Sequence, residues 1–202
     1  MTSNRIKIVI ATTNNHKLTE IAEILNDIPA ELLSLQDFPE IPPIEETGSS
    51  FRENALIKAQ TVFRHTGLIT LADDSGLEVD ALDGAPGIYS ARYSGKEHDY
   101  AANNQKLLEK LQNIPRKDRG ARFRCVTAIV GPESEQVVQG IVQGSIINEL
   151  RGSKGFGYDP LFVPQGFNRT FAELGEEVKN RISHRARAFR KAKDVLKSLL
   201  NE

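Results

Sequence analysis

Two neighbouring carboxylates, Asp73 and Asp74, are the residues of this 202-residue chain whose spacing points most directly to chemistry. They follow the apolar run Leu68–Ala72 and precede Ser75-Gly76, so two negative charges are held close together. Repulsion between them must be offset by a cation or a proton. A divalent ion such as Mg²⁺ takes oxygen ligands, commonly one or two carboxylates plus substrate phosphates. The candidate ligands are Asp73, Asp74, Glu45 and Glu46; the competing interpretation is that these acids only cap turns and face solvent.

Charge is segregated along the chain although the formal net charge is only -1. Residues 73–83 contain five acids and no base, whereas residues 177–193 contain seven bases and a single acid. From Arg190 on we interpret the bases as a solvated helix face. A protein with an acidic region that binds a metal ion and a separate cationic region is suited to a polyanionic substrate that carries a metal ion, such as a nucleoside triphosphate. The balanced total disfavours a protein that binds the nucleic-acid backbone, because such proteins usually have a basic excess.

Polar residues follow the first apolar run. The β-branched run Ile6–Ala11 predicts a buried strand, and apolar residues at helical spacing from His16 on predict a helix behind a short loop. Asn14 and Asn15 either shape the turn or hold a phosphate at the helix N-terminus. Lys17 lies in the first helical turn, where its charge opposes the helix dipole, so we favour a ligand-binding role for it.

A glycine-rich loop and a histidine–arginine pair are further candidates. Phe156 and Tyr158 stand between glycines in residues 152–158. Aromatic side chains in such a loop either fill the core or stack on a base. His184-Arg185 either begins a helix with a surface charge or binds a ligand, and spacing alone leaves both interpretations open.

Several other kinds of functional site are excluded because their sequence motifs are missing. The chain has no Gly-x-x-x-x-Gly-Lys-Ser/Thr and therefore no P-loop, and Gly155-x-Gly157 lacks the third glycine of the dinucleotide fingerprint. No Gly-x-Ser-x-Gly occurs and no histidine lies near Ser75 in the sequence, which disfavours a serine nucleophile. The four histidines lack metal-ligand spacing, and the single Cys125 excludes an internal disulfide and a cysteine-based zinc cluster.

Helices and strands alternate, which predicts an α/β fold with a mixed sheet and helices on both sides. Beyond the first strand and helix, the expected strands are Ala30–Leu35, Leu68–Ala72, Leu77–Leu82, Ala121–Val130, Val137–Ile147 and the short run Pro160–Val163. A turn is expected at Asp73–Gly76. Three later helices are expected. The first follows a capping box of Ser50 and Glu53, and the second spans Asp99–Leu111. The third closes the chain and has one apolar face, formed by Phe189, Ala192, Val195, Leu196, Leu199 and Leu200.

Composition is that of a globular protein, with 39% hydrophobic and 26% charged residues. No apolar run approaches the roughly 20 residues that a bilayer span needs. A strand beginning at Ile6 leaves no room for the charged and apolar regions of a signal peptide. We expect residues 1–202 to form a single, soluble, cytoplasmic domain with no membrane or nucleic-acid partner.

Seven segments, taken together, resemble the inosine triphosphate pyrophosphatase family, also described as XTP/dITP diphosphatases. They cover most of the chain and occur in the family's order. The segments are Ala11-Thr12-Thr13-Asn14-Asn15-His16-Lys17, Glu45-Glu46-Thr47-Gly48, Phe51-Arg52-Glu53-Asn54-Ala55, Ala72-Asp73-Asp74-Ser75-Gly76-Leu77, Gly84-Ala85-Pro86-Gly87-Ile88-Tyr89-Ser90-Ala91-Arg92-Tyr93, Gly155-Phe156-Gly157-Tyr158-Asp159-Pro160 and Ser183-His184-Arg185.

The resemblance implies an elongated α/β fold with two lobes around a central cleft, a homodimer, and Mg²⁺-dependent hydrolysis of ITP, dITP, XTP or dXTP. Water attacks the α-phosphorus and pyrophosphate leaves. By position, Asp74 would be the general base and a metal ligand, and Glu45 the other metal-binding carboxylate. The substrate-binding residues implied in the same way are Thr12, Thr13, Asn14, Asn15, His16 and Lys17 for the phosphates, Ser75, and Phe156, Gly157, Tyr158, Asp159, Lys179, His184 and Arg185 for the base.

A base pocket of this composition has a physical logic. Hypoxanthine and xanthine present a 6-keto acceptor and an N1–H donor, which donors at His184-Arg185 and an acceptor near Asp159 would match. Adenine reverses this pattern and leaves polar groups unpaired, a mismatch worth a discrimination of about 10⁴–10⁵. Guanine shares both groups, and the sequence does not show what excludes it.

Two other functions stay open at this stage. One is a related pyrophosphatase that prefers pyrimidine or modified nucleotides, and the other is a nucleotide-binding regulator without hydrolysis. The acidic set beside a phosphate loop favours an enzyme, since a protein that only binds has little need for an additional carboxylate. Because Asp73 and Asp74 titrate as a coupled pair, the sequence leaves open which of them accepts the proton.

Overall fold

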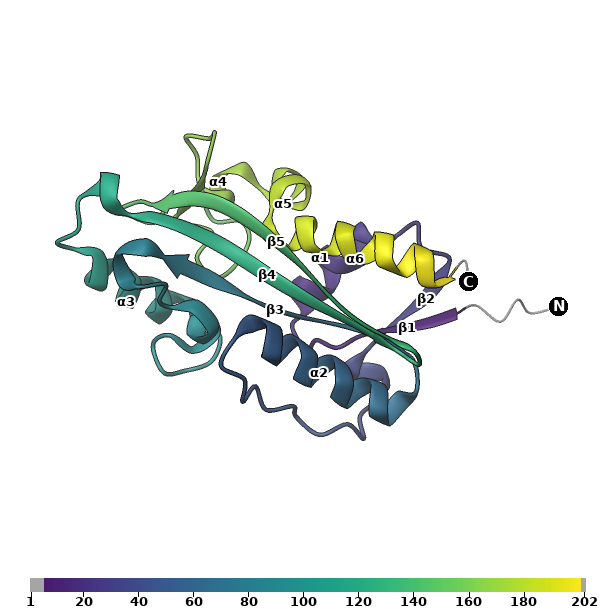
Figure 1. Ribbon diagram of the computed structural model, residues 1–202. Coiled ribbons are helices and arrows are strands. Elements are labelled where there is room, and N and C mark those ends of the chain that lie inside the picture. The colour runs from purple at the N-terminus through teal and green to yellow at the C-terminus, as the bar shows by residue number, and fades with distance from the viewer. Residues whose placement is uncertain (1–5, 201–202) are drawn as a thin grey trace. The chain divides into compact units, whose positions relative to one another are not determined.

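The structure, a computed structural model, describes residues 6–200 and contains one six-stranded sheet flanked by helices (Figure 1). The strand order is β2-β1-β3-β4-β5-β6. β1 pairs in parallel with β2 and β3, whereas β5 pairs antiparallel with β6. The strands are β1 (Ile6–Ile10), β2 (Ala30–Ser34), β3 (Ile69–Val79), β4 (Gly120–Gly131), β5 (Ser134–Ile146) and β6 (Phe162–Pro164). The predicted α/β class with a mixed sheet is confirmed.

Four of the helices match predicted ones, whereas the short helices Phe171–Leu174 and Glu176–Ile182 were not predicted. They are α1 (Asn15–Ile24), α2 (Phe51–Thr66), α3 (Tyr100–Leu111), α4 (Phe171–Leu174), α5 (Glu176–Ile182) and α6 (His184–Leu200). Ser50 caps α2 as expected, but the Glu53 carboxylate accepts from the backbone N–H of Ser49 at 2.6 Å, so the predicted capping box is only half correct. Among residues 6–200, no helix combines the length and the apolar character that a membrane crossing requires.

The chain divides into two compact units. Unit 1 holds the described residues of Met1–Asp74, Cys125–Gly140 and Arg185–Glu202. Unit 2 holds Ser75–Arg124 and Ile141–His184. The strands β3, β4 and β5 each contribute residues to both units.

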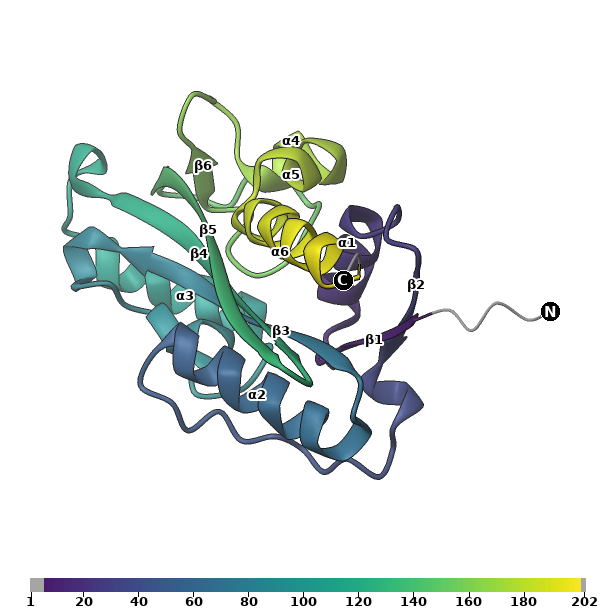
Figure 2. The same cartoon turned by 45° about the vertical axis from the view of Figure 1, so that its right-hand side comes forward.

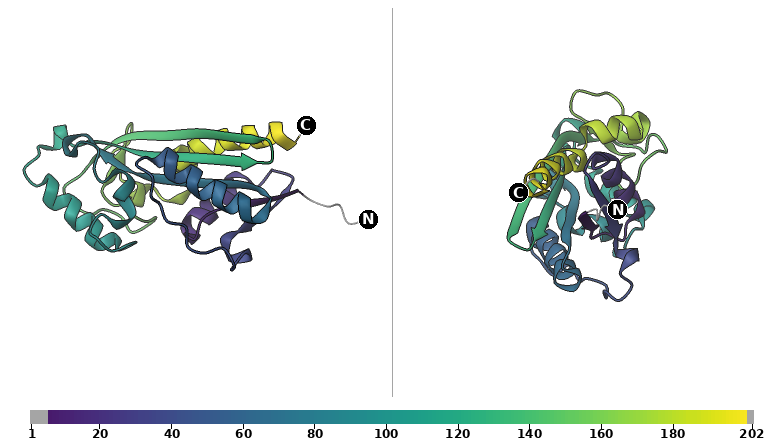
Figure 3. Two further views of the ribbon diagram at one scale, coloured as in Figure 1. Left: turned by 60° about the horizontal axis from the view of Figure 1, so that its bottom comes forward. Right: turned by 90° about the vertical axis from the view of Figure 1, so that its right-hand side faces the viewer.

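In unit 1, helices cover both faces of the strands. α1 and α6, from opposite ends of the sequence, lie side by side (Figure 3), and α2 lies on the other face of the strands (Figure 2). The core under α1 and α6 includes Ile21, Leu71, Ile129 and Phe189, all completely buried. This packing fixes the end of β1 and the middle of β3, where Asp73 and Asp74 lie.

In unit 2, the core is built on β3, β4 and β5 with the helices α3 and α4. Leu77, Leu107, Phe162 and Phe171 are nearly or completely buried in it. Tyr158 belongs to the same core, with 3% of its surface exposed. The glycine-rich loop is therefore anchored by an aromatic side chain directed into the interior.

One local prediction is wrong. β3 runs without interruption through Asp73, Asp74 and Ser75, where a turn was expected. Both aspartates are buried, with 2% and 5% of their surface exposed. Two adjacent buried carboxylates remain in a strand because the surrounding side chains compensate their charges.

Candidate functional site

Asp73 is held in an ion-pair cluster of unit 1. Its Oδ2 atom lies 3.0 Å from Lys17 Nζ and 3.6 Å from Arg185 Nη2. Burial acts to raise the pKa of Asp73, but the Lys17 and Arg185 charges outweigh it and hold that pKa well below its ordinary range. Asp73 is therefore an ionised anchor for two cations rather than a proton acceptor.

The loop between β1 and α1 positions Lys17. Asn14 caps α1, and its Oδ1 accepts from the Lys17 backbone N–H at 3.2 Å. The Thr12 hydroxyl accepts from the Asn14 backbone N–H at 3.2 Å, which closes the loop on itself. Thr13, Asn15 and His16 are exposed. The first turn of α1 thus combines backbone N–H groups, a half-buried ammonium and exposed polar side chains, a combination that suits an anion.

Arg185 belongs to the same cluster of unit 1. Its side chain is 2% exposed, and Nη1 donates to Glu20 Oε2 at 2.5 Å. Burial acts to lower the pKa of Arg185, yet Glu20 and Asp73 outweigh it and keep the guanidinium charged. The structure thus groups Arg185 with Asp73, whereas the resemblance assigns it to the base pocket. Glu20 was missed by the sequence analysis, although it lies one helical turn after Lys17.

Asp74 has a different environment from its neighbour. Its Oδ2 atom accepts a hydrogen bond of 3.0 Å from Asn54 Nδ2. Burial raises the pKa of Asp74, and the Glu46 charge adds to this; Lys58, Lys17 and the Asn54 bond act in the opposite direction without cancelling it. Of the two carboxylates, Asp74 therefore has the higher pKa, raised first of all by its burial.

The acidic segment before α2 approaches Asp74 through Glu46. Glu46 is half-buried and accepts from Lys58 Nζ at 2.5 Å, whereas Glu45 is exposed. Burial acts to lower the pKa of Lys58, but Asp74 and Glu46 outweigh it and raise that pKa. Asn54 and Lys58 were also missed as functional residues; the available signal was polar residues at i and i+4 on a helix whose neighbours Ala55 and Ala59 are completely buried.

The donor chemistry around Asp74 fits a hard divalent cation. Carboxylate oxygens from Asp74 and from the segment with Glu45 and Glu46 are the ligands that Mg²⁺ prefers. Within residues 6–200, no cluster of three or more His, Cys, Asp or Glu side chains is assembled for a metal ion. Two carboxylates and few protein ligands match the way Mg²⁺ shares its coordination with substrate phosphates and water.

Cys125 packs against the buried side of the ion-pair cluster. Its Sγ lies 3.8 Å from Asp73 Oδ2 and 3.7 Å from Thr127 Oγ1, and the side chain is completely buried. Burial, together with the Asp73 charge, raises the pKa of this thiol to about 12. Cys125 is consequently a packing residue, as the strand pattern around it indicates.

A second polar group lies in unit 2, on the glycine-rich loop and α5. Lys179 Nζ is 2.6 Å from Asp159 Oδ2, with both side chains almost fully buried, and it lies 4.2 Å from the centre of the Phe156 ring. The Phe156 backbone N–H donates to Asp159 Oδ2 at 2.9 Å. Gly155 has φ +75°, and a Cβ there would lie 2.2 Å from Asp159 Oδ2. The loop therefore requires glycine at 155 to bring Phe156 and Asp159 together.

The remaining predicted contacts of unit 2 are packed inward. The Tyr158 hydroxyl donates to the Ser90 carbonyl at 2.9 Å, so this ring fills the core and does not form the exposed stacking face considered from the sequence. His184 is buried and stacked on Phe123, with ring centres 4.7 Å apart. The Gly157 carbonyl accepts from Asn104 Nδ2 at 2.9 Å, a contact that was not predicted. Ser75 on β3 is half-buried.

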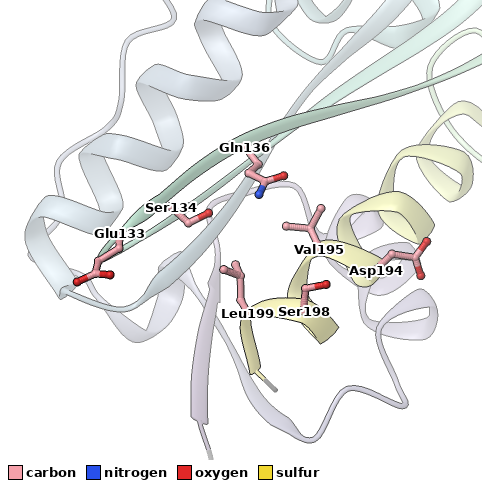
Figure 4. A pocket seen from close by; sticks show the side chains of 7 residues that line it. All are labelled: Glu133, Ser134, Gln136, Asp194, Val195, Ser198 and Leu199. Carbon is pink, nitrogen blue, oxygen red and sulfur yellow. The ribbon is translucent and has the colours of Figure 1, made fainter. Parts of the chain in front are cut away.

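A surface pocket of unit 1 is unrelated to these groups. It has a volume of about 490 Å³ and lies between the β4–β5 hairpin and α6 (Figure 4). Its lining consists of Glu133, Ser134, Gln136, Asp194, Val195, Ser198 and Leu199. Two carboxylates and no basic side chain make this pocket unsuitable for a polyphosphate.

Similar proteins are found over nearly the whole chain. The dITP/XTP pyrophosphatase of Desulforamulus reducens is 48% identical over 195 residues, covering 96% of this chain and 97% of its own. The dITP/XTP pyrophosphatase of Geobacter sulfurreducens is 51% identical over 191 residues, covering 94% of this chain and 96% of its own.

Solved structures agree with these relatives. A HAM1 protein from Coxiella burnetii has a TM-score of 0.88 at 43% identity and covers 96% of this chain and 99% of its own. A nucleoside-triphosphatase, dITP/XTP pyrophosphatase, from Mycobacterium abscessus has a TM-score of 0.78 at 50% identity and covers 93% of this chain and 98% of its own. The profile of the Ham1 family matches residues 8–195, and the chain therefore belongs to the Ham1 family.

Proposed function

We propose that this protein hydrolyses non-standard purine nucleoside triphosphates, namely dITP, ITP, XTP and dXTP, to the nucleoside monophosphate and pyrophosphate. The relatives named as dITP/XTP pyrophosphatases match almost the full chain. The observation that carries the mechanism is the unequal pair on β3, in which Asp73 is neutralised by two cations and Asp74 has a raised pKa. Such a pair supplies both an anchor for phosphate-binding cations and a general base.

The phosphates are assigned to unit 1. Lys17 and the N-terminal N–H groups of α1 bind phosphate oxygens, and the side chains of Thr12 to His16 complete this loop. Asp74 takes a proton from the attacking water as the oxygen–α-phosphorus bond forms. The bond between the α-phosphorus and its bridging oxygen then breaks, and pyrophosphate leaves with that oxygen. Asp73 holds Lys17 and Arg185 in place throughout the reaction.

Magnesium is proposed as the cofactor, with Asp74 and Glu45 as its carboxylate ligands and Glu46 as a neighbouring charge. When bound, a divalent cation neutralises phosphate oxygens and so stabilises the charge that develops on the leaving group. The charge interaction between the half-buried Glu46 and the buried Asp74 supports a further cation beside Lys58, since the repulsion adds to the burial that raises the pKa of Asp74.

The base is assigned to unit 2. Phe156 offers an aromatic face, Asp159 an acceptor and Lys179 a donor, all within one cluster. The acceptor matches the N1–H of hypoxanthine or xanthine and the donor matches the 6-keto oxygen. Gly157, Tyr158, Ser75, His184 and Arg185 stay proposed as substrate-binding positions, with Tyr158 acting from the core through the shape of the loop.

One assay tests this proposal. Purified protein is incubated with dITP and Mg²⁺, or with dITP and a chelator, and the phosphate products are identified. We expect pyrophosphate and dIMP with Mg²⁺, and a loss of turnover with the chelator. Rates on XTP, dGTP, ATP and dTTP measured in parallel define the base preference. Release of orthophosphate, or faster turnover of dTTP than of dITP, would contradict the proposal.

A cytoplasmic homodimer that binds neither membrane nor nucleic acid is proposed as well. The support is the membership of the Ham1 family and the balanced charge of the chain. Light scattering coupled to gel filtration measures the mass in solution, and we expect twice the 22.4 kDa of one chain.

A further inference from the structure

Asn54, on the first turn of α2, is a completely buried amide that bonds to two different elements of unit 1. Its Nδ2 donates to Asp74 Oδ2 at 3.0 Å, and its Oδ1 accepts from the Gly48 backbone N–H at 2.8 Å. A backbone N–H only donates, so the oxygen of the amide must face Gly48 and the nitrogen must face Asp74. Both hydrogen bonds thus fix one orientation of the side chain.

The segment that carries Glu46 rests directly on this side chain. A Cβ at Gly48 would lie 2.7 Å from Asn54 Oδ1 and 2.6 Å from Glu53 Cβ. The Glu53 carboxylate also accepts from Ser49 at 2.6 Å, and Lys58, one turn along α2, pairs with Glu46. Asn54 therefore connects the first turn of α2 to two elements that carry carboxylates, the segment before α2 and the strand β3.

The position is unusual for a polar residue. Its neighbours Ala55 and Ala59 are completely buried, and an apolar side chain at 54 would gain from burial without needing hydrogen-bond partners. An amide at this position has a specific effect, because its N–H fixes the plane of the Asp74 carboxylate and thereby the direction of the second oxygen.

We infer that Asn54 is a positioning residue, which orients the Asp74 carboxylate toward the attacking water and keeps the Glu46 segment at a fixed place beside it. This inference rests on the proposed function, because it assigns Asn54 an effect on the step in which Asp74 takes the proton. Asn54 acts through Asp74 and does not itself contact the substrate.

The test is a double-mutant cycle on dITP hydrolysis. Asn54→Leu removes both hydrogen bonds and keeps the branching and the number of heavy atoms, and Asn54→Asp keeps the acceptor for Gly48 but replaces the donor to Asp74 with a second carboxylate. We expect kcat to fall on the order of 10²-fold in either variant while KM changes less than about threefold, since misorientation affects the chemical step. In an Asp74→Asn background, Asn54→Leu should lower the residual rate by no more than about twofold, because the two residues act as a unit.

Asn103 provides a matched control. It is equally buried, its Oδ1 accepts from the Ser94 backbone N–H at 2.7 Å, and its Nδ2 donates to the Ala91 carbonyl at 3.1 Å. Asn103→Leu should lower the melting temperature, as Asn54→Leu does, yet leave kcat nearly unchanged. If Asn54→Leu does not fold, Asn54→Asp carries the comparison.

The outcomes separate the two proposals. If wild-type protein releases pyrophosphate from dITP and the Asn54 variants keep its kcat, or lose the same factor with and without Asp74, the positioning role is wrong and the function stands. If wild-type protein releases no pyrophosphate from dITP, the proposed function is wrong and the role of Asn54 in it is overturned as well.

Discussion

Two adjacent aspartates of the same strand lie in different electrostatic surroundings. Asp73 contacts Lys17 and Arg185, and those charges keep it ionised in spite of burial. At Asp74, burial, with the Glu46 charge adding to it, raises the pKa although the Asn54 hydrogen bond acts in the opposite direction. A pair of carboxylates whose environments separate their pKa values is the arrangement that acid–base catalysis requires.

Replacing Asp74 tests whether this carboxylate is the general base. We expect Asp74→Asn to lower kcat by about 10²–10⁴-fold, the usual contribution of a general base, with a circular-dichroism spectrum like that of the wild type. Asp194→Asn, an exposed carboxylate on α6, serves as the control and should keep full activity. A rate close to wild type for Asp74→Asn would remove Asp74 from the mechanism.

Replacing Asp73 tests whether its ion pairs with Lys17 and Arg185 stabilise the fold. Asp73→Asn removes the buried carboxylate that lies beside both Lys17 and Arg185, although Glu20 still pairs with Arg185, and should lower the free energy of unfolding at pH 7 by about 3–5 kcal/mol. Because the folded pKa of Asp73 lies below the ordinary 3.8, its contribution is present above pH 3.8 and disappears as the pH falls toward the folded value. Urea unfolding at pH 7 and at lower pH should therefore show the difference between wild type and variant shrinking below pH 3.8. A difference independent of pH would contradict the ion-pair account.

At the scale of elements, the glycine-rich loop is the part whose shape depends most on one residue. Gly155→Ala places a Cβ against the Asp159 carboxylate and should displace it from Lys179. We expect KM for dITP to rise and the preference for dITP over ATP to fall, with a smaller effect on kcat. Gly166→Ala is the matched control, since Gly166 has φ +88° but nothing within 4 Å of its Cβ. Equal kinetic effects of both changes would show that backbone strain, and not Asp159, is responsible.

The elements with strong periodicity were predictable from the sequence. β1, the polar loop and α1 follow from a β-branched run, turn residues and helical spacing, and β4 and β5 follow from the apolar runs Ala121–Val130 and Val137–Ile147. The continuous β3 was not predictable, because two adjacent acids favour a turn unless distant cations compensate them. Those cations come from α1 and α6, and no local pattern connects them to residue 73.

The candidate site was predictable as a set of residues but not as a set of contacts. The resemblance assigned roles to Lys17, Asp74, Asp159 and Lys179, whereas the partners Glu20, Asn54, Lys58 and Asn104 were assigned none and are identified by their contacts. They lie on helices, where polar residues are ordinarily interpreted from the sequence as facing solvent. Tertiary contacts, which determine whether such a residue is buried, are not encoded in local spacing.

At the scale of the whole molecule, each unit holds one of the two polar groups. Unit 1 contains the cluster of Asp73, Lys17 and Arg185 together with Asp74, and unit 2 contains Asp159, Lys179 and Phe156. β3 passes from one unit to the other between Asp74 and Ser75. Each unit can consequently be tested against the part of the substrate proposed for it, the phosphates for unit 1 and the base for unit 2.

The lone thiol of the chain gives an internal measure of how often unit 1 opens. Cys125 is completely buried beside Asp73, and with a pKa of about 12 it is almost entirely protonated at pH 8. Alkylation by iodoacetamide must therefore wait for transient exposure, so its rate in native buffer, divided by the rate in urea, reports the equilibrium of opening. We expect mass spectrometry to show slow labelling of the wild type, faster labelling of Asp73→Asn, and slower labelling when nucleotide is bound. The labelling rate of Cys125 would then measure ligand binding without any turnover.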